Sequence, residues 1–433
     1  MGRKEAIGLL VVGRDDDVLG AGHANEVLRP PWVLLDDRHR GLALLLPSIS
    51  AGERTNVSRP ARSRRPTAPS KREKHFGRCR SLAFAWRWGI IGRRRARSAL
   101  AMQVFMHACV GLAIFGAGVV GQIGAPRDGG RFMNAVRRPW PGPQVTLPFF
   151  LRKAWTSMVG RAGGVPRVPF DPEALLHNPS ITWIGHSTML VRMDGVTFLT
   201  DPIFSQRASP VPFAGPKRLV PPGVPLDALP RIDFATLSHD HYDHTDLPSI
   251  EALARRGVRF VAALGMGDLV RGVGGDVVEL DWWQTASIGS VRVHCVPAQH
   301  FSGRALADHD QRLWAGWVVE GATRRFYHAG DTGYFAGFRE IGERLGPIDL
   351  AALPIGAYDP PAMMQFVHLD PEEAVRAALD LGARRVLAMH WGTFDLTDEP
   401  LDEPPRRFHA AATAEGFDAD HAWTLDVGET RGW

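Results

Sequence analysis

The sequence predicts an α/β protein in which two mixed sheets carry helices on their outer faces. Two observations predict it: from about residue 180 short β-branched runs alternate with helical ones, and hairpin patterns come before strand–helix alternation. The 433 residues are ample for one large core. A hydrophobic content of 45% and a charged content of 22% exclude wholesale disorder and collagen-like repeats.

The first predicted strands are Ile181–Gly185, Met189–Met193 and Val196–Thr200, and the last two meet at Asp194-Gly195, a strong hairpin signal. Further strands are predicted over Ile232–Leu237, Val291–Val296, Trp314–Glu320, Arg324–Tyr327, Leu350–Leu353 and Arg385–Met389. Helices are predicted over Leu247–Arg256, Phe335–Leu345 and Pro371–Leu381. The last of these begins with proline and two glutamates, which suit the first turn of a helix.

The net charge of +5 conceals two unlike regions. Residues 1–100 contain 21 basic and 9 acidic residues, whereas the rest contains 30 and 37. Residues 1–97 form a basic, low-complexity extension that we predict to be disordered, because no apolar period runs through its Arg-, Ser- and Pro-rich part. Such an arm could bind nucleic acid or anionic lipid, but a solvated tail, or a start site placed too far upstream, explains it more simply.

Residues 98–126 contain no Asp, Glu, Lys or Arg and follow the basic cluster Arg93–Arg97. This pattern resembles a signal peptide or signal anchor, which would place the rest of the chain outside the cytoplasm. A buried helix in a cytoplasmic protein is the alternative, since the apolar centre is short for a membrane span and carries His107. The following Pro-rich stretch to about residue 179 is expected to wrap on the body, and its aromatic–basic patch Pro148–Trp155 either packs there or touches a bilayer.

A dense cluster of metal-binding residue types follows a predicted strand, in the string Ser238-His-Asp-His-Tyr-Asp-His244. His239 and His241 point the same way in extended chain and can share one cation, while Asp243 and His244 reach a second. Three other predicted strands end close to a potential ligand: His300, Asp331 and His390. With only three cysteines in the chain, a metal here must be held by nitrogen and oxygen.

These residues resemble the metallo-β-lactamase superfamily. More specifically, Trp183-Ile-Gly-His-Ser-Thr188, Gly330-Asp-Thr-Gly-Tyr334, His368-Leu-Asp-Pro-Glu-Glu-Ala-Val375 and Met389-His-Trp-Gly-Thr-Phe394 resemble N-acyl-phosphatidylethanolamine-hydrolysing phospholipase D and its bacterial relatives. The resemblance covers roughly residues 130–430. It implies a hydrolase domain over 127–433 with a four-layer αβ/βα sandwich.

The resemblance also implies a site that binds two zinc ions, and it assigns a set of ligand residues to each ion. One zinc would take His239, His241 and His300; the other would take Asp243, His244 and His390; Asp331 would bridge them. Neutral imidazoles and carboxylates suit zinc, although iron or manganese at one position stays an alternative. Two such cations lower the pKa of a bridging water and neutralise a phosphodiester, with Asp243 or Asp331 orienting the nucleophile.

Further residues are assigned supporting roles. Asp201 is expected to hydrogen-bond a ligating histidine, with a strand-end cap as the alternative. Tyr358 and His368 are expected at the substrate opening, with His186 and Gln299 as further substrate-binding candidates. For each, a structural role is the alternative.

We therefore predict a binuclear metal-dependent phosphodiesterase acting on phospholipids of the N-acyl-phosphatidylethanolamine kind. Two alternatives stay open: a same-fold hydrolase of a small soluble sugar-phosphate lactone or cyclic phosphodiester, and a nuclease with a basic RNA-binding arm. The expected partners are a phospholipid or other phosphodiester and a membrane surface. An oligomer stays open, and nucleic acid is not favoured.

Overall fold

The computed structural model describes residues 124–136, 141–159, 165–305 and 307–433. The predictions for residues 1–97, and for all but the last three residues of the segment 98–126, lie outside this part of the chain. In the part that is described, no helix has both the length and the apolar character to cross a membrane.

Two sheets of seven strands form the centre of the fold. One contains β3 (Ser180–Gly185), β4 (Thr188–Met193), β5 (Val196–Thr200), β6 (Phe234–Leu237), β7 (Arg259–Ala263), β8 (Asp276–Leu280) and β16 (Thr430–Gly432), in the order β16-β3-β4-β5-β6-β7-β8. The other contains β9 (Thr285–Ile288), β10 (Val291–Val296), β11 (Gly316–Glu320), β12 (Arg325–His328), β13 (Leu350–Pro354), β14 (Val386–Met389) and β15 (Ala422–Trp423), in the order β15-β14-β13-β12-β11-β10-β9. Both mix antiparallel with parallel pairs.

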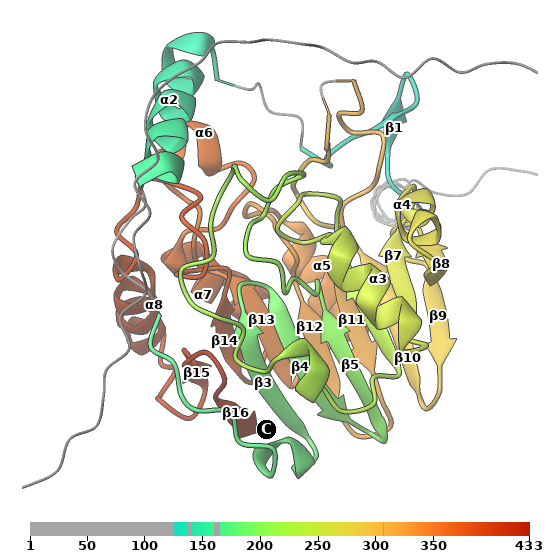
Figure 1. Cartoon of the computed structure of the whole chain (residues 1–433). Helices are drawn as coiled ribbons and strands as arrows, with labels where there is room; N and C mark the ends of the chain where they lie inside the picture. The colour runs from blue at the N-terminus through green and yellow to red at the C-terminus, as the bar shows by residue number, and fades with distance from the viewer. Residues whose placement is uncertain (1–123, 137–140, 160–164, 306) are drawn as a thin grey trace, which may run out of the picture. The chain divides into compact units, whose positions relative to one another are not determined.

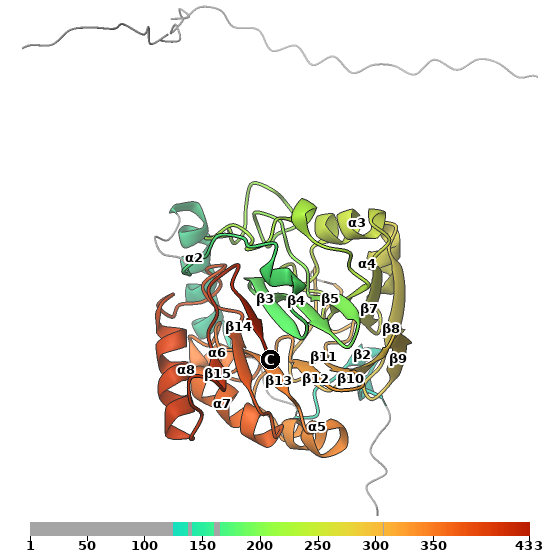
Figure 2. The same ribbon diagram turned by 90° about the horizontal axis from the view of Figure 1, so that it is seen from below.

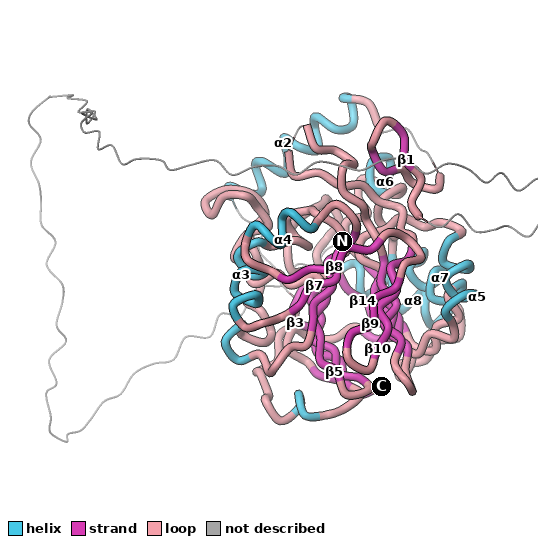
Figure 3. Tube along the Cα trace, turned by 90° about the vertical axis from the view of Figure 1, so that its right-hand side faces the viewer, coloured by secondary structure: helices cyan, strands magenta, loops and turns pink. Residues whose placement is uncertain are grey.

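Helices cover the outer face of each sheet, so the molecule has four layers (Figures 2 and 3). Outside the first sheet lie α3 (Leu247–Arg255) and α4 (Gly267–Gly272); outside the second lie α5 (Gly337–Leu345), α7 (Pro371–Asp380) and α8 (Glu403–Ala414). Short 3₁₀ turns occupy Ala174–Leu176 and Leu226–Ala228. The predicted αβ/βα sandwich is confirmed, and every predicted strand and helix is present to within two residues at each end.

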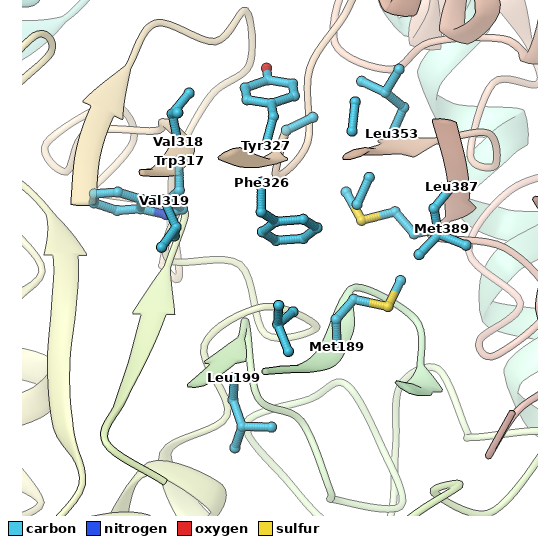
Figure 4. Packing of buried hydrophobic residues seen from close by; sticks show 14 of the residues in the cluster. Met189, Leu199, Trp317, Val318, Val319, Phe326, Tyr327, Leu353, Leu387 and Met389 are labelled. Atoms are coloured by element: carbon cyan, nitrogen blue, oxygen red, sulfur yellow. The ribbon is translucent and has the colours of Figure 1, made fainter. Parts of the chain in front are cut away.

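The core fills the space between the sheets. Along β12, Phe326 points toward the first sheet and Tyr327 points the other way, as alternation in a strand requires (Figure 4). Met189 of β4 lies on the opposite side of this space (Figure 4), the ring centroid of Phe326 is 5.9 Å from that of Phe198 of β5, and the Phe326, Tyr327 and Met189 side chains are fully buried. The expected Asp194-Gly195 hairpin is present: both residues have positive φ, 47° and 86°, which favours a two-residue turn matching the twist of its strands.

Several of the elements that the sequence did not predict lie together at one end of the sandwich. The helix α2 (Pro143–Val159) lies beside the short α6 (Pro361–Met364), and the hairpin of β1 (Arg127–Asp128) and β2 (Arg131–Phe132) lies at the same end (Figure 1). The strands β12, β13 and β14 are parallel, and α6 follows the carboxyl end of β13. This end is therefore the edge at which those strands finish.

Candidate metal centre

The expected ligands come together at this edge of the sandwich. Each lies in the loop that directly follows a strand: the 239–244 string after β6, His300 after β10, Asp331 after β12 and His390 after β14. β10 is antiparallel to β11 and β11 to β12, so β10 ends on the same side as the parallel strands β12 and β14. The topology thus collects residues up to about 150 positions apart in the sequence.

Three imidazoles form one group of potential ligands. Nε2 of His239 lies 2.9 Å from Nδ1 of His241, which lies 3.2 Å from Nε2 of His300. Nδ1 of His300 donates to the carbonyl of Val367 over 2.8 Å, so its Nε2 faces the other two rings. These nitrogens converge closely enough to share one cation.

A second group of potential ligands surrounds Asp243. Oδ2 of Asp243 is 3.5 Å from Nε2 of both His244 and His390, and 2.9 Å from Nε2 of His186. His186 is 1% exposed, so it lies behind Asp243, on the protein side of the cluster. The ring centroids of His186 and His390 are 4.1 Å apart.

The carboxylate of Asp331 lies between the two groups. Its Oδ1 is 3.1 Å from Nε2 of His390, and its Oδ2 is 3.1 Å from Nε2 of His244. The same Oδ2 is 3.9 Å from His239 and 3.8 Å from His300. One buried carboxylate therefore reaches both sets of imidazoles, as a bridging ligand must.

The electrostatics suit cation binding. Burial, together with neighbouring imidazoles, holds the pKa of His239 and His300 well below the usual range, so both rings are neutral and free to donate an electron pair. Burial also opposes charge on His390, but Asp331 and Asp243 overcome it and raise the pKa of His390 to about 9. The pKa of His244 is raised well above its usual value for the same reason.

A test of whether metal fits comes from the buried polar atoms. His244 Nε2, His390 Nε2 and Asp331 Oδ1 have no hydrogen-bond partner and are shielded from water. Such atoms cost free energy unless something binds them. Several of them facing one another, with imidazole nitrogen and carboxylate oxygen only, fit divalent zinc, iron or manganese.

Asp201 fixes the loop that carries the motif. Its Oδ1 accepts from the backbone N–H of Ser238 at 2.7 Å, and its Oδ2 accepts from the Ser238 hydroxyl at 2.6 Å. The same Oδ2 lies 2.8 Å from Nδ1 of His244. The ring of His244 is thereby held with Nε2 toward Asp331.

The motif's other aspartate, Asp240, turns away from the cluster. Its carboxylate accepts from the N–H of Gly303 at 2.7 Å and pairs with Arg312 at 2.9 Å. Asp240 is fully buried and belongs to the support of the loop.

Asn134 is a supporting residue that the sequence did not reveal. Its side-chain amide donates to the carbonyl of His300 at 2.7 Å, and its carbonyl oxygen accepts from the backbone N–H of His300 at 3.0 Å. Trp314 Nε1 donates to the same oxygen at 3.0 Å. The segment before α2 therefore clamps the main chain of a potential ligand.

The four residues predicted to bind substrate have different surroundings. His368 is half-buried, with Nδ1 3.9 Å from Oδ2 of Asp331. The amide of Gln299 donates to the carbonyl of Phe366, and its oxygen is buried without a partner. The hydroxyl of Tyr358 donates to Glu403 of α8 at 2.9 Å, and His186 is bonded to Asp243 as described above. Of the four, His186 contacts the cluster directly through Asp243, and His368 lies next to it, 3.9 Å from Asp331.

A cavity of about 290 Å³ opens beside His300. Its lining mixes apolar and charged side chains, including Phe132, Met133, Phe301 and Trp314 as well as Asp128, Arg131, His309 and Asp310. The cavity gives a substrate a way to the edge of the cluster.

Comparisons with known proteins match this chain over the same region. Residues 197–391 match the family model described as "Beta-lactamase superfamily domain". N-acyl-phosphatidylethanolamine-hydrolyzing phospholipase D 1 of Caenorhabditis elegans is 42% identical over 263 residues, 57% of this chain and 74% of that protein. An uncharacterized protein of Mycobacterium tuberculosis is 47% identical over 54% of this chain, and the match spans 64% of that protein. Among solved structures, the metallo hydrolase Igni18 of Ignicoccus hospitalis is 24% identical, with a TM-score of 0.45 over 58% of this chain and 97% of its own.

Removing the Asn134 clamp is expected to weaken metal binding. Asn134→Ala leaves the N–H and carbonyl of His300 without their partner, and such changes behind a ligand typically weaken metal binding about 10- to 100-fold. Asn134→Asp keeps the acceptor and loses the donor, so its effect should be intermediate. The measurement is a zinc dissociation constant from competition with a chelator, with the exposed Gln311→Ala as control. An Asn134→Ala affinity within twofold of the wild type would contradict the clamp.

Metal loading is expected to release protons at neutral pH. Because the metal-free pKa of His390 is about 9 and that of His244 is also raised, both rings are positively charged at pH 7. Each must lose one proton before its nitrogen can bind metal. Apparent metal affinity should therefore rise with pH until about pH 9. Calorimetric titrations in two buffers of different ionisation enthalpy count these protons, and His390→Gln should release fewer. Equal heats in the two buffers would rule this out.

Proposed function

This chain belongs to the metallo-β-lactamase superfamily, in the branch of the N-acyl-phosphatidylethanolamine-hydrolysing phospholipases D, and we propose that it is a two-zinc phosphodiesterase acting on phospholipids of that kind. That it is a metal-dependent hydrolase follows from the family. The observation that carries the finer proposal is the buried donor set of two groups joined by Asp331, in a chain 42% identical to a phospholipase D of this type.

The residues divide the work as follows. His239, His241 and His300 would hold one metal, Asp243, His244 and His390 the other, and Asp331 both. Bound together, two such ions acidify a water molecule and offset the negative charge of a phosphodiester. Asp243 or Asp331 would orient that water as well as holding metal. His368, half-buried and 3.9 Å from Asp331, is placed to hydrogen-bond a phosphate oxygen.

A small soluble phosphodiester or lactone is the second candidate substrate. The cavity beside His300 favours it, because Asp128, Arg131, His309 and Asp310 give that opening a charged rim. The same charged side chains could also bind a lipid headgroup, so activity assays must distinguish the two kinds of substrate. The position of the catalytic domain outside the cytoplasm stays a prediction.

A membrane surface is the partner that the helix α2 supports. Phe149 packs against Met363 and Met364 of α6, while Lys153 pairs with Asp395 at 3.0 Å. The helix is thus attached on one side to loops at the metal edge. Four large apolar side chains of the same helix are between 55% and 65% exposed: Leu147, Phe150, Leu151 and Trp155. Such a patch is costly in water and suits an apolar interface.

An activity panel on the zinc-loaded full chain tests the proposed function. It includes N-acyl-phosphatidylethanolamine, a generic bis-aryl phosphodiester and a lactone, with His241→Ala as the matched variant that lacks one ligand. We expect hydrolysis of both phosphodiesters, and in His241→Ala a lower zinc content together with a rate reduced at least 100-fold. Turnover of the lactone without phosphodiesterase activity would refute the proposal.

Replacing apolar side chains of α2 is expected to weaken binding to vesicles but not hydrolysis of the soluble bis-aryl substrate. Leu151→Glu and Trp155→Ala remove exposed groups, and a buried leucine-sized side chain contributes about 1.5–3 kcal/mol, so sedimentation with anionic vesicles should fall at least tenfold. Phe213→Ala, which removes another exposed aromatic group outside α2, is the control. Unchanged sedimentation of both α2 variants would show that this face does not bind the bilayer.

A further inference from the structure

A second cavity, of about 550 Å³, lies beside the metal edge and is mainly apolar. Its large lining side chains are Met133, Val136, Trp282, Trp283, Pro297 and Phe335. Glu340 brings a carboxylate to the lining, and the remaining residues are small, apart from Asn134. The chemistry of this surface is that of a site for hydrocarbon.

The position of this cavity connects it to the cluster. Pro297 lies three residues before His300 in the same loop, and Phe335 lies four residues after Asp331. Met133 and Asn134 line both this cavity and the smaller one that opens beside His300. A molecule held at Asp331 and His300 therefore has an apolar surface within reach along the segment 133–136.

Trp283 is held in place at unusual conformational cost. Its φ of 68° is in the left-handed region, which a bulky side chain rarely adopts. Its N–H donates to the carbonyl of Cys295 at 2.7 Å, and the guanidinium of Arg344 lies 4.2 Å from its ring centre. Arg344 is itself paired with Glu340 at 2.6 Å. Strain of this kind persists where the surroundings enforce it and is concentrated at binding sites.

From these observations we propose that the cavity binds one fatty acyl chain of the phospholipid while its phosphodiester lies at the metal edge. This inference rests on the proposed function and adds to it the surface that selects for chain length. The charged rim beside His300 suits the phosphate and headgroup, whereas Trp282, Trp283 and Phe335 offer only apolar and aromatic contacts to the hydrocarbon. Burial of each methylene there should raise kcat/KM about three- to fourfold until the cavity is full.

The test uses the zinc-loaded full chain and N-acyl-phosphatidylethanolamines in mixed micelles, with the length of one acyl chain varied at a time. For at least one chain, kcat/KM should rise with length and then level off. Trp283→Ala should lower kcat/KM at least tenfold for long chains and leave short chains and the bis-aryl phosphodiester within twofold. Ala336→Trp, a change at an exposed lining residue that needs no core rearrangement, should make the plateau begin at a shorter chain. Phe213→Ala is the control.

Each alternative outcome has a distinct meaning. If both cavity variants keep the wild-type length profile while hydrolysis continues, the cavity does not bind the acyl chain and the proposed function stands. A wild-type rate independent of every chain length would also overturn the inference, and would leave another occupant, such as an apolar segment of this chain, for the cavity. If the wild type hydrolyses no phosphodiester at all, it is the proposed function that fails.

Discussion

The burial of Asp331 among imidazoles is the constraint on which the rest of the site depends. A carboxylate taken out of water is stable only when opposite charge or donors surround it. Here His244 and His390 both approach within 3.1 Å, and their own pKa values rise in response. The cluster is balanced either by protons on these rings or by cations. A metal that replaced the protons would find these groups already assembled, because the folding of the two sheets brings their loops together.

Bringing these loops together strains the backbone around the cluster. Four residues other than glycine that border the cluster have positive φ: His186 (54°), Asp201 (35°), Ala357 (66°) and His390 (62°). Each follows the end of a strand, and neighbouring groups hold each in place. The backbone N–H of His186 donates to the hydroxyl oxygen of Thr393, and the backbone N–H of Ala357 donates to the buried carboxylate of Glu399. Local strain at the edge is therefore compensated by the two sheets beneath it.

The sequence predicted the strands that the structure contains, and it proposed a ligand set, because both depend on local sequence patterns. β-Branched runs indicate the strands. Of the seven expected ligands, all except His300 and His390 lie in two short strings, 239–244 and 330–334. The supporting contacts are of another kind. The side chain of Asn134 hydrogen-bonds the main chain of His300, which is 166 positions away. The local sequence Phe132–Ala135 contains no pattern that predicts this contact. Pairing of this sort is decided by the packing of the whole domain.

The helix α2 was missed for a related reason. Pro148 lies inside it, and its apolar residues are spread around the helix instead of forming one stripe, so the 3.6-residue period is weak. Tyr358 shows the limit for side chains: its place on a loop at the metal edge could be predicted, but the direction of its hydroxyl, toward Glu403, depends on where α8 packs.

The apolar surfaces at the metal edge support the proposed lipid substrate. The charged cluster and the charged rim beside His300 would serve a soluble phosphodiester as well as a lipid. This chain also places the exposed face of α2 and the cavity around Trp283 at the same end of the sandwich, one attached through Met363 and Met364 to the loop before His368, the other through Met133 to the segment that clamps His300. Each apolar surface thus includes or contacts residues that are only a few positions in the sequence from a residue at the cluster or from one that holds it. An amphiphile that satisfied all three surfaces would bring its phosphate to Asp331 with its hydrocarbon already sheltered from water.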